Sequence, residues 1–453
     1  MVLKLCGFSI DGSDVFLTFQ QNEFAISRNT HVLVNHLLDH IPSEWHTHLD
    51  NITNDELNAL PFGYIKDEWP ASLKTFIQTI ESLKSERSIP NAAVHGLNLP
   101  QDFFKGLSVK KRHEIIRLAP VIHTKCSEHN ISVIIDIGAG LGYLPQLLFE
   151  KYGYNVLAIE ADATKVETAI KRQHLLYNSS LNHVKYVQHF VDEESAEFLQ
   201  NTLAQLTMID SSSSVCLVGL HACADLTVTL LRLFSNMIGV HQALVMPCCY
   251  HRLRRVPGDT IIELFANFPV SNSLRKLYDS VDGGKFLTSA FLRLACQNTA
   301  AKWRGMSPED HTRHSTAAMR RAILQKVTEE VGYHLSRTKR KTHGSSEHDD
   351  FNVYLDRLTL THHLTDPKQP DQLQLITLET FRSKMQNAWK CYEKDCRLLE
   401  VFSAFQTSIQ SICENVVLLD RVQMVKELGY ACCTRQVTDD CISPRCYAII
   451  ANK

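Results

Sequence analysis

The sequence lacks the segments that would carry a chain into or across a membrane. No run of about 20 apolar residues occurs anywhere in its 453 residues. Residues 1–16 do not join a basic start to a long apolar stretch. Fourteen cysteines in a long chain without such a leader are typical of reduced thiols. We therefore expect a protein of the cytosol, the nucleus or both, without a membrane partner.

The sequence also lacks a strong excess of either charge. Its 47 Lys and Arg residues are balanced by 49 Asp and Glu residues, so the formal net charge is −2. This balance excludes a general attraction to nucleic acid, and an RNA acceptor would need a local basic cluster. Two short clusters occur, Lys110–Arg112 and the group Arg252, Arg254 and Arg255. Together they would form a basic mouth for phosphate or for an acidic protein segment, which keeps RNA among the candidate partners.

A glycine-rich turn is the most informative feature that the sequence does contain. Val133–Ile137 is a β-branched run interrupted only by Asp136, as in a buried parallel strand. Three alternating glycines follow within Gly138–Gly142, and Leu144–Tyr152 has the pattern of a helix. Glycine permits positive φ and a close approach of ligand to backbone, and the helix start offers free N–H groups. The segment therefore predicts a ligand-binding turn.

The spacing of the glycines favours one class of ligand. Dinucleotide-binding turns need G-x-G-x-x-G, but here the third glycine comes one residue early and Tyr143 occupies its place. The arrangement D-x-G-x-G-x-G instead resembles motif I of Rossmann-like S-adenosylmethionine (SAM) methyltransferases. Glu160 follows the next apolar strand, Asn155–Ile159, where an acid can accept both ribose hydroxyls. NAD enzymes share such an acid, so Glu160 indicates a nucleoside cofactor without choosing between them.

Histidine and cysteine side chains follow two later strands. Val215–Leu220 and Ala243–Met246 are apolar runs of strand length. Because the carboxyl ends of parallel strands meet at one edge of a sheet, the residues that follow should converge beside the cofactor. They are His221, Cys223, Asp225, Cys248, Cys249, Tyr250 and His251.

Two chemistries fit this convergence, and inert buried thiols are the third alternative. His221 or Asp225 can act as a general base while Tyr250 shapes an acceptor pocket. Alternatively, H-x-C facing C-C-x-H supplies up to five metal ligands. No C-x-x-C spacing supports a metal, and free cysteine often fills cores as a small hydrophobe. We therefore predict a substrate pocket and no metal site.

Four segments carry a closer family resemblance. They occur in the order Lys-Lys-x-His-Glu from Lys110, Asp-Ile-Gly-Ala-Gly-Leu-Gly from Asp136, Gly-Leu-His-Ala-Cys-Ala-Asp-Leu from Gly219, and Met-Pro-Cys-Cys-Tyr-His from Met246. Together they resemble the methyltransferase-like 25 and 25B group, also described as ribosomal RNA adenine dimethylase domain-containing proteins. The resemblance covers about residues 107–300 and implies a SAM-dependent methyltransferase domain, but it supplies no substrate.

The adenine dimethylase description does not fit the residues after the fourth strand. Adenine N6-methyltransferases carry an [Asn/Asp]-Pro-Pro-[Tyr/Phe] or Asn-Leu-Pro-Tyr motif there, which grips the amino nitrogen and stacks on the base. This chain has Gly-Leu-His-Ala-Cys at Gly219–Cys223. We therefore do not expect methylation of adenine N6.

Roles for individual residues follow from the glycine motif, from the convergence of the strand ends and from the basic start of the helix before the first strand. The cofactor side comprises Asp136, Gly138, Ala139, Gly140, Gly142, Glu160 and Asp192, the last as an adenine contact or, equally, a helix cap. The proposed catalytic residues are His221, Asp225, Tyr250 and His251. Acceptor-binding residues are Lys110, Lys111, His113, Cys248 and Cys249; a solvated helix face explains the first three equally well.

The rest of the chain predicts additions around an α/β core. Residues 1–105 read as a helical N-terminal region and 106–252 as the methyltransferase core. Residues 253–415 read as a mostly helical insertion with a basic linker near 336–350. Residues 416–453 read as a helix and two strands that close the sheet, the last strand antiparallel. The predicted fold is thus a Rossmann-like class I methyltransferase sheet with a helical cap and a large helical insertion.

Three functions follow from these patterns. The leading one is SAM-dependent methyl transfer to an unidentified acceptor, which is RNA, protein or a small molecule. The second is a non-catalytic, cofactor-binding interaction protein. The third is an NAD-dependent oxidoreductase, which the early third glycine disfavours. Nothing in the sequence indicates an oligomeric state.

Overall fold

The computed structural model describes residues 2–5, 8–11, 27–84, 101–206, 214–257, 263–280, 286–337, 350–365 and 378–453. The chain forms two compact units, and both are discontinuous in sequence. The sheet unit comprises residues 1–17, 84–299 and 411–453, and the helical unit comprises 18–83 and 300–410. These boundaries cut across the predicted ones, because residues 84–105 and 253–299 belong with the sheet.

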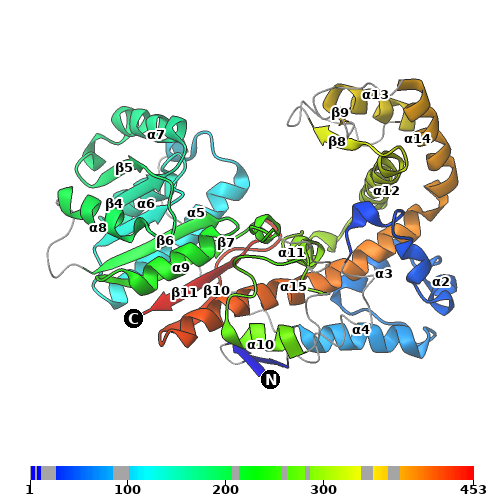
Figure 1. The fold of residues 1–453 in the computed structure, drawn as a ribbon, viewed down its shortest axis with the longest axis horizontal. Helices are drawn as coiled ribbons and strands as arrows, with labels where there is room; N and C mark the ends of the chain where they lie inside the picture. The colour runs from blue at the N-terminus through cyan, green and yellow to red at the C-terminus, as the bar shows by residue number, and fades with distance from the viewer. Residues whose placement is uncertain are drawn as a thin grey trace. The chain divides into compact units, whose positions relative to one another are not determined.

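The sheet unit is built on a seven-stranded sheet of order β10-β11-β7-β6-β3-β4-β5 (Figure 1). Strands β5, β4, β3, β6 and β7 are parallel, while β11 pairs antiparallel with β7 and β10 antiparallel with β11. The bounds are β3 (Val133–Ile137), β4 (Asn155–Glu160), β5 (Val184–Gln188), β6 (Val215–Ala222), β7 (Val240–Pro247), β10 (Ala431–Gln436) and β11 (Tyr447–Asn452). This confirms the predicted Rossmann-like class and its closing strand pair.

Helices between the strands pack on the sheet. α9 lies across β6 and β7, whereas α6 rests on β4 and β5 and contacts α5 (Figure 1). Every residue of β3 is buried, which explains its nearly unbroken apolar sequence. The helix bounds are α5 (Val109–Glu128), α6 (Tyr143–Tyr152), α7 (Ala163–Leu176), α8 (Ser195–Gln205), α9 (Leu226–Asn236), α10 (Asn272–Ser280) and α11 (Ser289–Ala295).

Three local features of the sheet unit bear on the sequence predictions. Ser108 caps α5 as predicted, since its side chain accepts the Lys111 N–H. A hairpin of β1 (Val2–Leu5) and β2 (Phe8–Asp11) replaces the expected helical start. Within the predicted helical insertion, residues 261–268 have the pattern of a helix, but their described part, residues 263–268, is not helical. Short 3₁₀ turns complete the unit at η5 (Gln101–Phe104), η6 (Asn178–Ser180) and η7 (Tyr250–Arg252).

The helical unit contains α2 (Ser43–Leu49), α3 (Asn54–Ala59), α4 (Ala71–Leu83), α12 (Pro308–Glu330), α13 (Phe351–Thr361), α14 (Leu378–Tyr392) and most of α15 (Cys396–Glu427). A small hairpin of β8 (His334–Arg337) and β9 (His362–Thr365) accompanies them, and 3₁₀ turns lie at η4 (Leu60–Phe62), η9 (Ala300–Trp303) and η10 (Glu393–Asp395). Most of the predicted basic linker, residues 338–349, lies outside the described residues. Within the described ranges, no helix has both the length and the hydropathy needed to span a bilayer.

Apolar residues at helical spacing predict one helix over 29–40 and two helices over 398–417 and 420–428, and the structure differs in both places. The expected helix over 29–40 is two separate 3₁₀ turns, η2 (Asn29–His31) and η3 (Leu37–His40). His36 caps the second turn with φ 52°, and a left-handed residue cannot continue a right-handed helix. Conversely, the two helices predicted over 398–417 and 420–428 are one continuous helix, α15.

Candidate cofactor and acceptor site

The glycine turn after β3 is shaped by two different requirements. Gly138, Gly140 and Gly142 have φ of 79°, 60° and 74°, which L-residues with side chains rarely adopt. A Cβ on Gly138 or Gly140 would meet no atom within 4 Å, so these two glycines border open space. A Cβ on Gly142 would overlap the Tyr186 hydroxyl, which accepts a hydrogen bond from Gln146 at 3.0 Å. Gly138 and Gly140 thus leave open space, called the cradle below, in which a ligand can reach the backbone, while Gly142 lets the start of α6 pack against Tyr186 of β5.

Asp136 is a buried carboxyl with an unused acceptor atom. Its residue is 2% exposed, and its Oδ1 has no hydrogen-bond partner among the described residues. Burial, and secondarily the negative charge of Glu160, raises the pKa of Asp136 to about 7. A buried oxygen without a partner is costly, so this position suits a ligand group that donates hydrogen bonds or carries positive charge.

Glu160 at the end of β4 links the glycine turn to α7. Its Oε2 accepts the Gly140 N–H at 3.0 Å, and its Oε1 accepts the Asp162 N–H at 3.1 Å. Lys165 lies 3.5 Å from Oε1. Each carboxylate oxygen accepts two hydrogen bonds, so these contacts leave capacity for ribose hydroxyls. Glu160 is therefore placed beside the cradle, as a ribose-binding acid requires.

Asp192 forms local turn contacts just before α8, whose N-cap residue is Glu194. Its Oδ1 accepts the Ser195 hydroxyl at 2.8 Å and the Glu194 N–H at 3.1 Å, where the chain enters α8. The side chain is exposed. These contacts tie the side chain to the turn that leads into α8, and the adenine contact stays a prediction.

The end of β6 lies beside the end of β3. Asp136 is the register partner of Val218, so the residues after each strand reach the same edge of the sheet. His221 there has φ 63° and Ala224 has φ 52°, a conformation that is uncommon and costly for residues with side chains. Strained residues of this kind persist where the surrounding structure holds them, which is frequent in functional sites.

His221 is held by a buried glutamate on α5. The Nε2 of His221 lies 2.8 Å from Oε2 of Glu114, whose residue is 0% exposed. The other carboxylate oxygen accepts the Ser443 hydroxyl at 2.6 Å, and Lys110 Nζ lies 3.6 Å from it. Burial raises the pKa of Glu114. Hydrogen bonds from His221 and Ser443 and the charge of Lys110 lower it by more than burial raises it, so the pKa lies below its ordinary value.

An ionised Glu114 determines which nitrogen of His221 carries the proton. A carboxylate only accepts hydrogen bonds, so Nε2 is the donor and Nδ1 of a neutral ring is the acceptor. Glu114 ends the Lys-Lys-x-His-Glu segment but was not among the predicted site residues. The available clue was its spacing of four residues from Leu118 and eight from Ile122, which puts a carboxyl on the buried stripe of α5.

The remaining residues predicted to bind the acceptor have different surroundings. Lys110 reaches Glu114, whereas Lys111 is exposed at the helix start. His113 Nε2 accepts the Asp439 N–H at 3.1 Å from the loop between β10 and β11, and burial lowers the pKa of His113. Lys110 is therefore the one member of this group that the structure brings to the Glu114–His221 pair.

Three of the predicted catalytic residues are engaged in packing contacts. Asp225 accepts the Asn267 amide at 2.8 Å and the Arg254 N–H at 3.0 Å, so both its oxygens hold the 254–267 segment. Tyr250 is 3% exposed and its hydroxyl donates to Glu414 at 3.3 Å, while burial raises its pKa well above the ordinary value. His251 Nδ1 lies 2.9 Å from Cys296 Sγ. These contacts give Asp225 and Tyr250 roles in packing, and their catalytic roles stay predictions.

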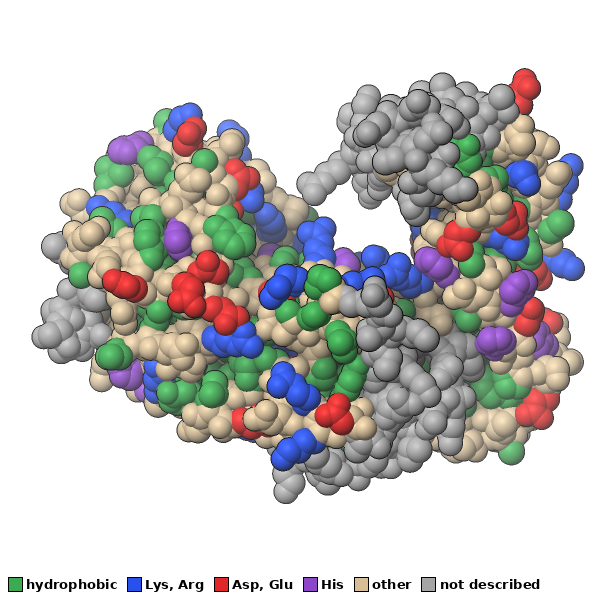
Figure 2. Space-filling model, in the orientation of Figure 1, with side chains coloured by type: hydrophobic (Ala, Val, Ile, Leu, Met, Phe, Trp, Pro, Cys, Tyr) green, Lys and Arg blue, Asp and Glu red, His purple; other side chains and the backbone are tan. Residues whose placement is uncertain are grey.

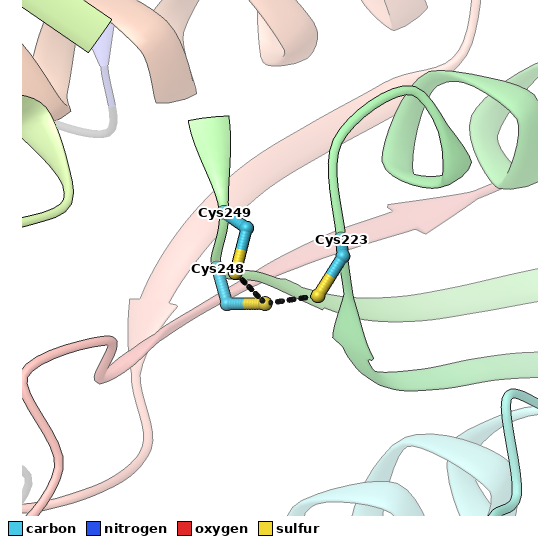
Figure 3. A group of neighbouring side chains, drawn as sticks. All are labelled: Cys223, Cys248 and Cys249. Carbon is cyan, nitrogen blue, oxygen red and sulfur yellow. Dashed lines mark hydrogen bonds between the residues drawn. The ribbon is translucent and has the colours of Figure 1, made fainter. Parts of the chain in front are cut away.

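The predicted thiols do converge. Cys223 follows β6, and Cys248 and Cys249 follow β7; Sγ of Cys223 lies 2.8 Å from Sγ of Cys248 (Figure 3). The β6 and β7 ends thus carry a histidine–glutamate pair and a group of sulfur atoms.

Some of the basic side chains that were expected to form a basic mouth at this edge are engaged in other contacts. The Arg112 guanidinium lies 4.5 Å from the centre of the Phe104 ring, and Arg255 forms an ion pair with Glu263 at 2.5 Å. On the face shown in Figure 2, acidic and basic side chains are interspersed over the sheet unit. This agrees with the small net charge.

Comparison with known proteins identifies the domain. Residues 110–256 match the family model of a methyltransferase domain. The chain is similar to the probable methyltransferase-like protein 25 of Mus musculus, with 24% identity over 255 residues, 54% of this chain and 38% of the relative. The Homo sapiens protein of that name is 25% identical over 244 residues, 52% of this chain and 36% of the relative. The chain thus covers less than two fifths of the length of these curated relatives.

Solved methyltransferases are also similar, at low scores. Coclaurine N-methyltransferase bound to N-methylheliamine and S-adenosylhomocysteine (SAH) has a TM-score of 0.26 and 13% identity, covering 85% of this chain and 95% of that one. A putative SAM-dependent methyltransferase of Methanococcus maripaludis has a TM-score of 0.24 and 14% identity, covering 52% and 91%. Scores at this level carry no argument about function. The family match and the curated relatives confirm the predicted methyltransferase domain and the resemblance to methyltransferase-like 25 proteins.

Proposed function

We propose that this chain is a SAM-dependent methyltransferase in which His221, positioned by Glu114, removes a proton from the acceptor. The observation that carries the proposal is the arrangement of two parallel strand ends. The end of β3 offers an open glycine cradle, and the adjacent end of β6 offers a histidine whose proton is fixed by a buried carboxylate.

The residues around the glycine turn fit the cofactor. The unpartnered Asp136 oxygen suits the cofactor's ammonium group, directly or through water, and Glu160 suits the ribose hydroxyls. The open sides of Gly138 and Gly140 let a ligand reach the backbone. When bound, SAM supplies an electrophilic methyl group on a sulfonium. The chain contributes the cradle, the orientation of the acceptor and a base.

The Glu114–His221 pair supports proton removal from the acceptor. Glu114 accepts the Nε2 proton of His221, so Nδ1 presents its lone pair and can take a proton from an O–H or N–H nucleophile. The resulting imidazolium is stabilised by the neighbouring carboxylate, which itself stays ionised. Ser443 and Lys110 fix that carboxylate from its other side. An acceptor with an O–H or N–H group that needs deprotonation is therefore favoured.

The acceptor's molecular class and the location in the cell are also part of the proposal. RNA, protein and small molecules remain candidates, and Lys110 places a cation beside the Glu114–His221 pair. The described cysteines are all free, which supports a reducing compartment, the cytosol or the nucleus.

Binding and transfer should be measured separately. Calorimetry with SAM, SAH and NAD tests the cofactor, and tritiated SAM with cell fractions of RNA, protein and small molecules tests transfer. We expect Asp136→Ala to weaken SAM binding. His221→Ala should bind SAM normally and lose about 10²–10⁴-fold in transfer rate. His241→Ala is the matched control, because His241 is exposed on β7 and its imidazole hydrogen-bonds, among the described residues, only to the Gly239 carbonyl.

Three results would overturn the proposal. Binding of NAD without binding of SAM would indicate an oxidoreductase. Binding of SAM with no label in any fraction above the Asp136→Ala background would indicate a non-catalytic interaction protein. Equal transfer by His221→Ala and the parent would remove the proposed base.

A further inference from the structure

Three thiols meet at the ends of β6 and β7; Cys223, Cys248 and Cys249 are called the cysteine cluster below. Cys223 Sγ lies 2.8 Å from Cys248 Sγ, which lies 3.5 Å from Cys249 Sγ, and all three sulfurs lie within 4.8 Å of one another. Figure 3 shows the side chains pointing toward one another from two adjacent strand ends. The cluster therefore forms because the sheet holds the neighbouring strands β6 and β7 in register, which brings together residues that are 25 positions apart in the sequence.

The cluster differs from the thiols of the hydrophobic core. Cys126 and Cys216 are 0% exposed and pack among apolar side chains, as cysteines that fill space do. In the cluster Cys248 is also buried, at 8% exposure, but Cys223 and Cys249 are partly exposed. In the part of the chain that the structure describes, the three cluster sulfurs hydrogen-bond only to one another. Core packing therefore does not explain their convergence.

The number of sulfurs favours a cation over a disulfide. A disulfide uses two sulfurs and leaves the third without a role. Thiolates at these separations repel one another, so more than one can ionise only when a cation neutralises them. A soft or borderline metal does this and prefers sulfur ligands.

We infer that the cysteine cluster binds a zinc ion through the sulfurs of Cys223, Cys248 and Cys249. Each thiol releases its proton to solvent and forms one Zn–S bond, with no change of oxidation state. At a Zn–S length of about 2.3 Å, tetrahedral geometry places sulfurs roughly 3.8 Å apart. The present separations of 2.8 and 3.5 Å need to widen by about 1 Å or less.

The fourth coordination position goes to water or to His251. His251 follows Cys249 by two residues on η7, and its Nδ1 now contacts Cys296 Sγ at 2.9 Å. A zinc ion here would connect the strained C-terminal end of β6 and the residues that follow it, where His221 and Ala224 have positive φ, to the segment after β7. The inference does not depend on methyl transfer.

The test is the metal content of the full chain purified under reducing, anaerobic conditions without added metal. Elemental analysis should find about one zinc per chain. The triple variant Cys223→Ser/Cys248→Ser/Cys249→Ser should fall about tenfold or more in bound zinc. Cys391→Ser/Cys396→Ser, at two cysteines of the helical unit, should retain the metal. Cobalt(II) exchanged into the parent should give thiolate-to-metal charge-transfer absorption, and the triple variant should not.

A second measurement uses the parent chain alone and stays informative if the triple variant does not fold. Alkylation mapped by mass spectrometry should leave the cysteine cluster protected until a chelator removes zinc, while Cys391 reacts throughout. Zinc-free protein that takes up no cobalt would overturn the inference. A Cys223–Cys248 disulfide in the anaerobic preparation, or alkylation of the cluster at equal rates with and without chelator, would also overturn it.

Discussion

Two buried carboxyl groups of the sheet unit, Asp136 and Glu114, differ in their partners and therefore in their chemistry. Asp136 at the cofactor edge has an oxygen with no partner among the described residues, and burial raises its pKa to about 7. Glu114 at the acceptor edge is bonded to His221 and Ser443, and its pKa is lowered although burial opposes this. Burial alone therefore does not determine the protonation of a carboxyl group; its hydrogen-bond donors do.

The difference also separates two kinds of functional residue. An acid without a hydrogen-bond donor gains its partner when a ligand binds, so its substitution should mainly lower the affinity for the ligand. An acid whose hydrogen-bond partners belong to the chain acts by positioning them, so its substitution should lower kcat and the free energy of unfolding. Three substitutions test this contrast, in order of decreasing expected effect.

The largest effect is expected at Glu114. Glu114→Gln removes the charge that fixes the His221 tautomer, and we expect kcat to fall about 10²–10⁴-fold with little change in SAM affinity. Glu114→Ala also leaves His221 and Ser443 without their partner, which should lower the free energy of unfolding by about 3 kcal/mol. Single-turnover transfer and urea unfolding measure the two effects.

A matched control lies on the same helix. Glu128 is partly exposed and pairs with Lys125, so Glu128→Gln should change neither kcat nor stability measurably. Because the pKa of Glu114 is lowered by folding, its stabilising contribution is present above its unfolded pKa and is lost on acidification. A parent pH profile of kcat that Glu114→Gln leaves unmoved would contradict the positioning role.

The second effect is expected at Asp136, where substitution should raise the free energy of unfolding, whereas substitution of Glu114 should lower it. Because folding raises this pKa to about 7, the native chain binds the proton more tightly, and stability falls as the pH rises from about 4 to 7. Asp136→Asn should abolish that fall and make the variant more stable than the parent at pH 8, by up to about 4 kcal/mol. Its SAM affinity should drop about tenfold or more, because the charge that attracts the ammonium is gone.

Thermal unfolding between pH 4 and 8, with calorimetry of SAM binding, checks the Asp136 prediction. Asp279→Asn, an exposed acid on α10, should follow the parent in both measurements. A variant that is less stable than the parent at pH 8, or that binds SAM as tightly as the parent, would show that Asp136 serves the fold and not the ligand.

The smallest effect is expected at Asp192, an exposed acid engaged only in local turn contacts among the described residues. Asp192→Ala should cost about 1 kcal/mol of stability and leave the dissociation constant for SAM unchanged. Chemical unfolding and calorimetry measure the pair of values. A large loss of SAM affinity without loss of stability would support the adenine contact predicted from the sequence.

The cofactor edge could be predicted from the sequence because its determinants are local. A β-branched strand, alternating glycines and an acid after the next strand all lie within Val133–Glu160. The closing strand pair was also predictable, since a helix ending at a glycine and two short apolar strands mark it. The same local logic failed at His36, where a left-handed backbone ended the expected helix.

The acceptor edge could be predicted only in outline, because its contacts are distant in sequence. Parallel strand ends bring His221 and the thiols to one edge, as expected. Glu114 is 107 residues from His221 and 329 from Ser443, and no spacing rule links positions so far apart. The packing contacts of Asp225 and Tyr250 could not be predicted for the same reason: their partners Asn267 and Glu414 lie on segments whose packing the sequence does not reveal.

The bond from Ser443 to Glu114 has a consequence for how the protein matures. The hydroxyl that completes the glutamate's partners lies in the loop between β10 and β11, more than 300 residues after α5 is synthesised. While a ribosome is still translating the helical unit, the nascent chain has the glycine turn, the histidine and the glutamate but not this hydroxyl. A growing polypeptide can thus form the cradle early, whereas the histidine–glutamate pair is complete only after the final hairpin has emerged.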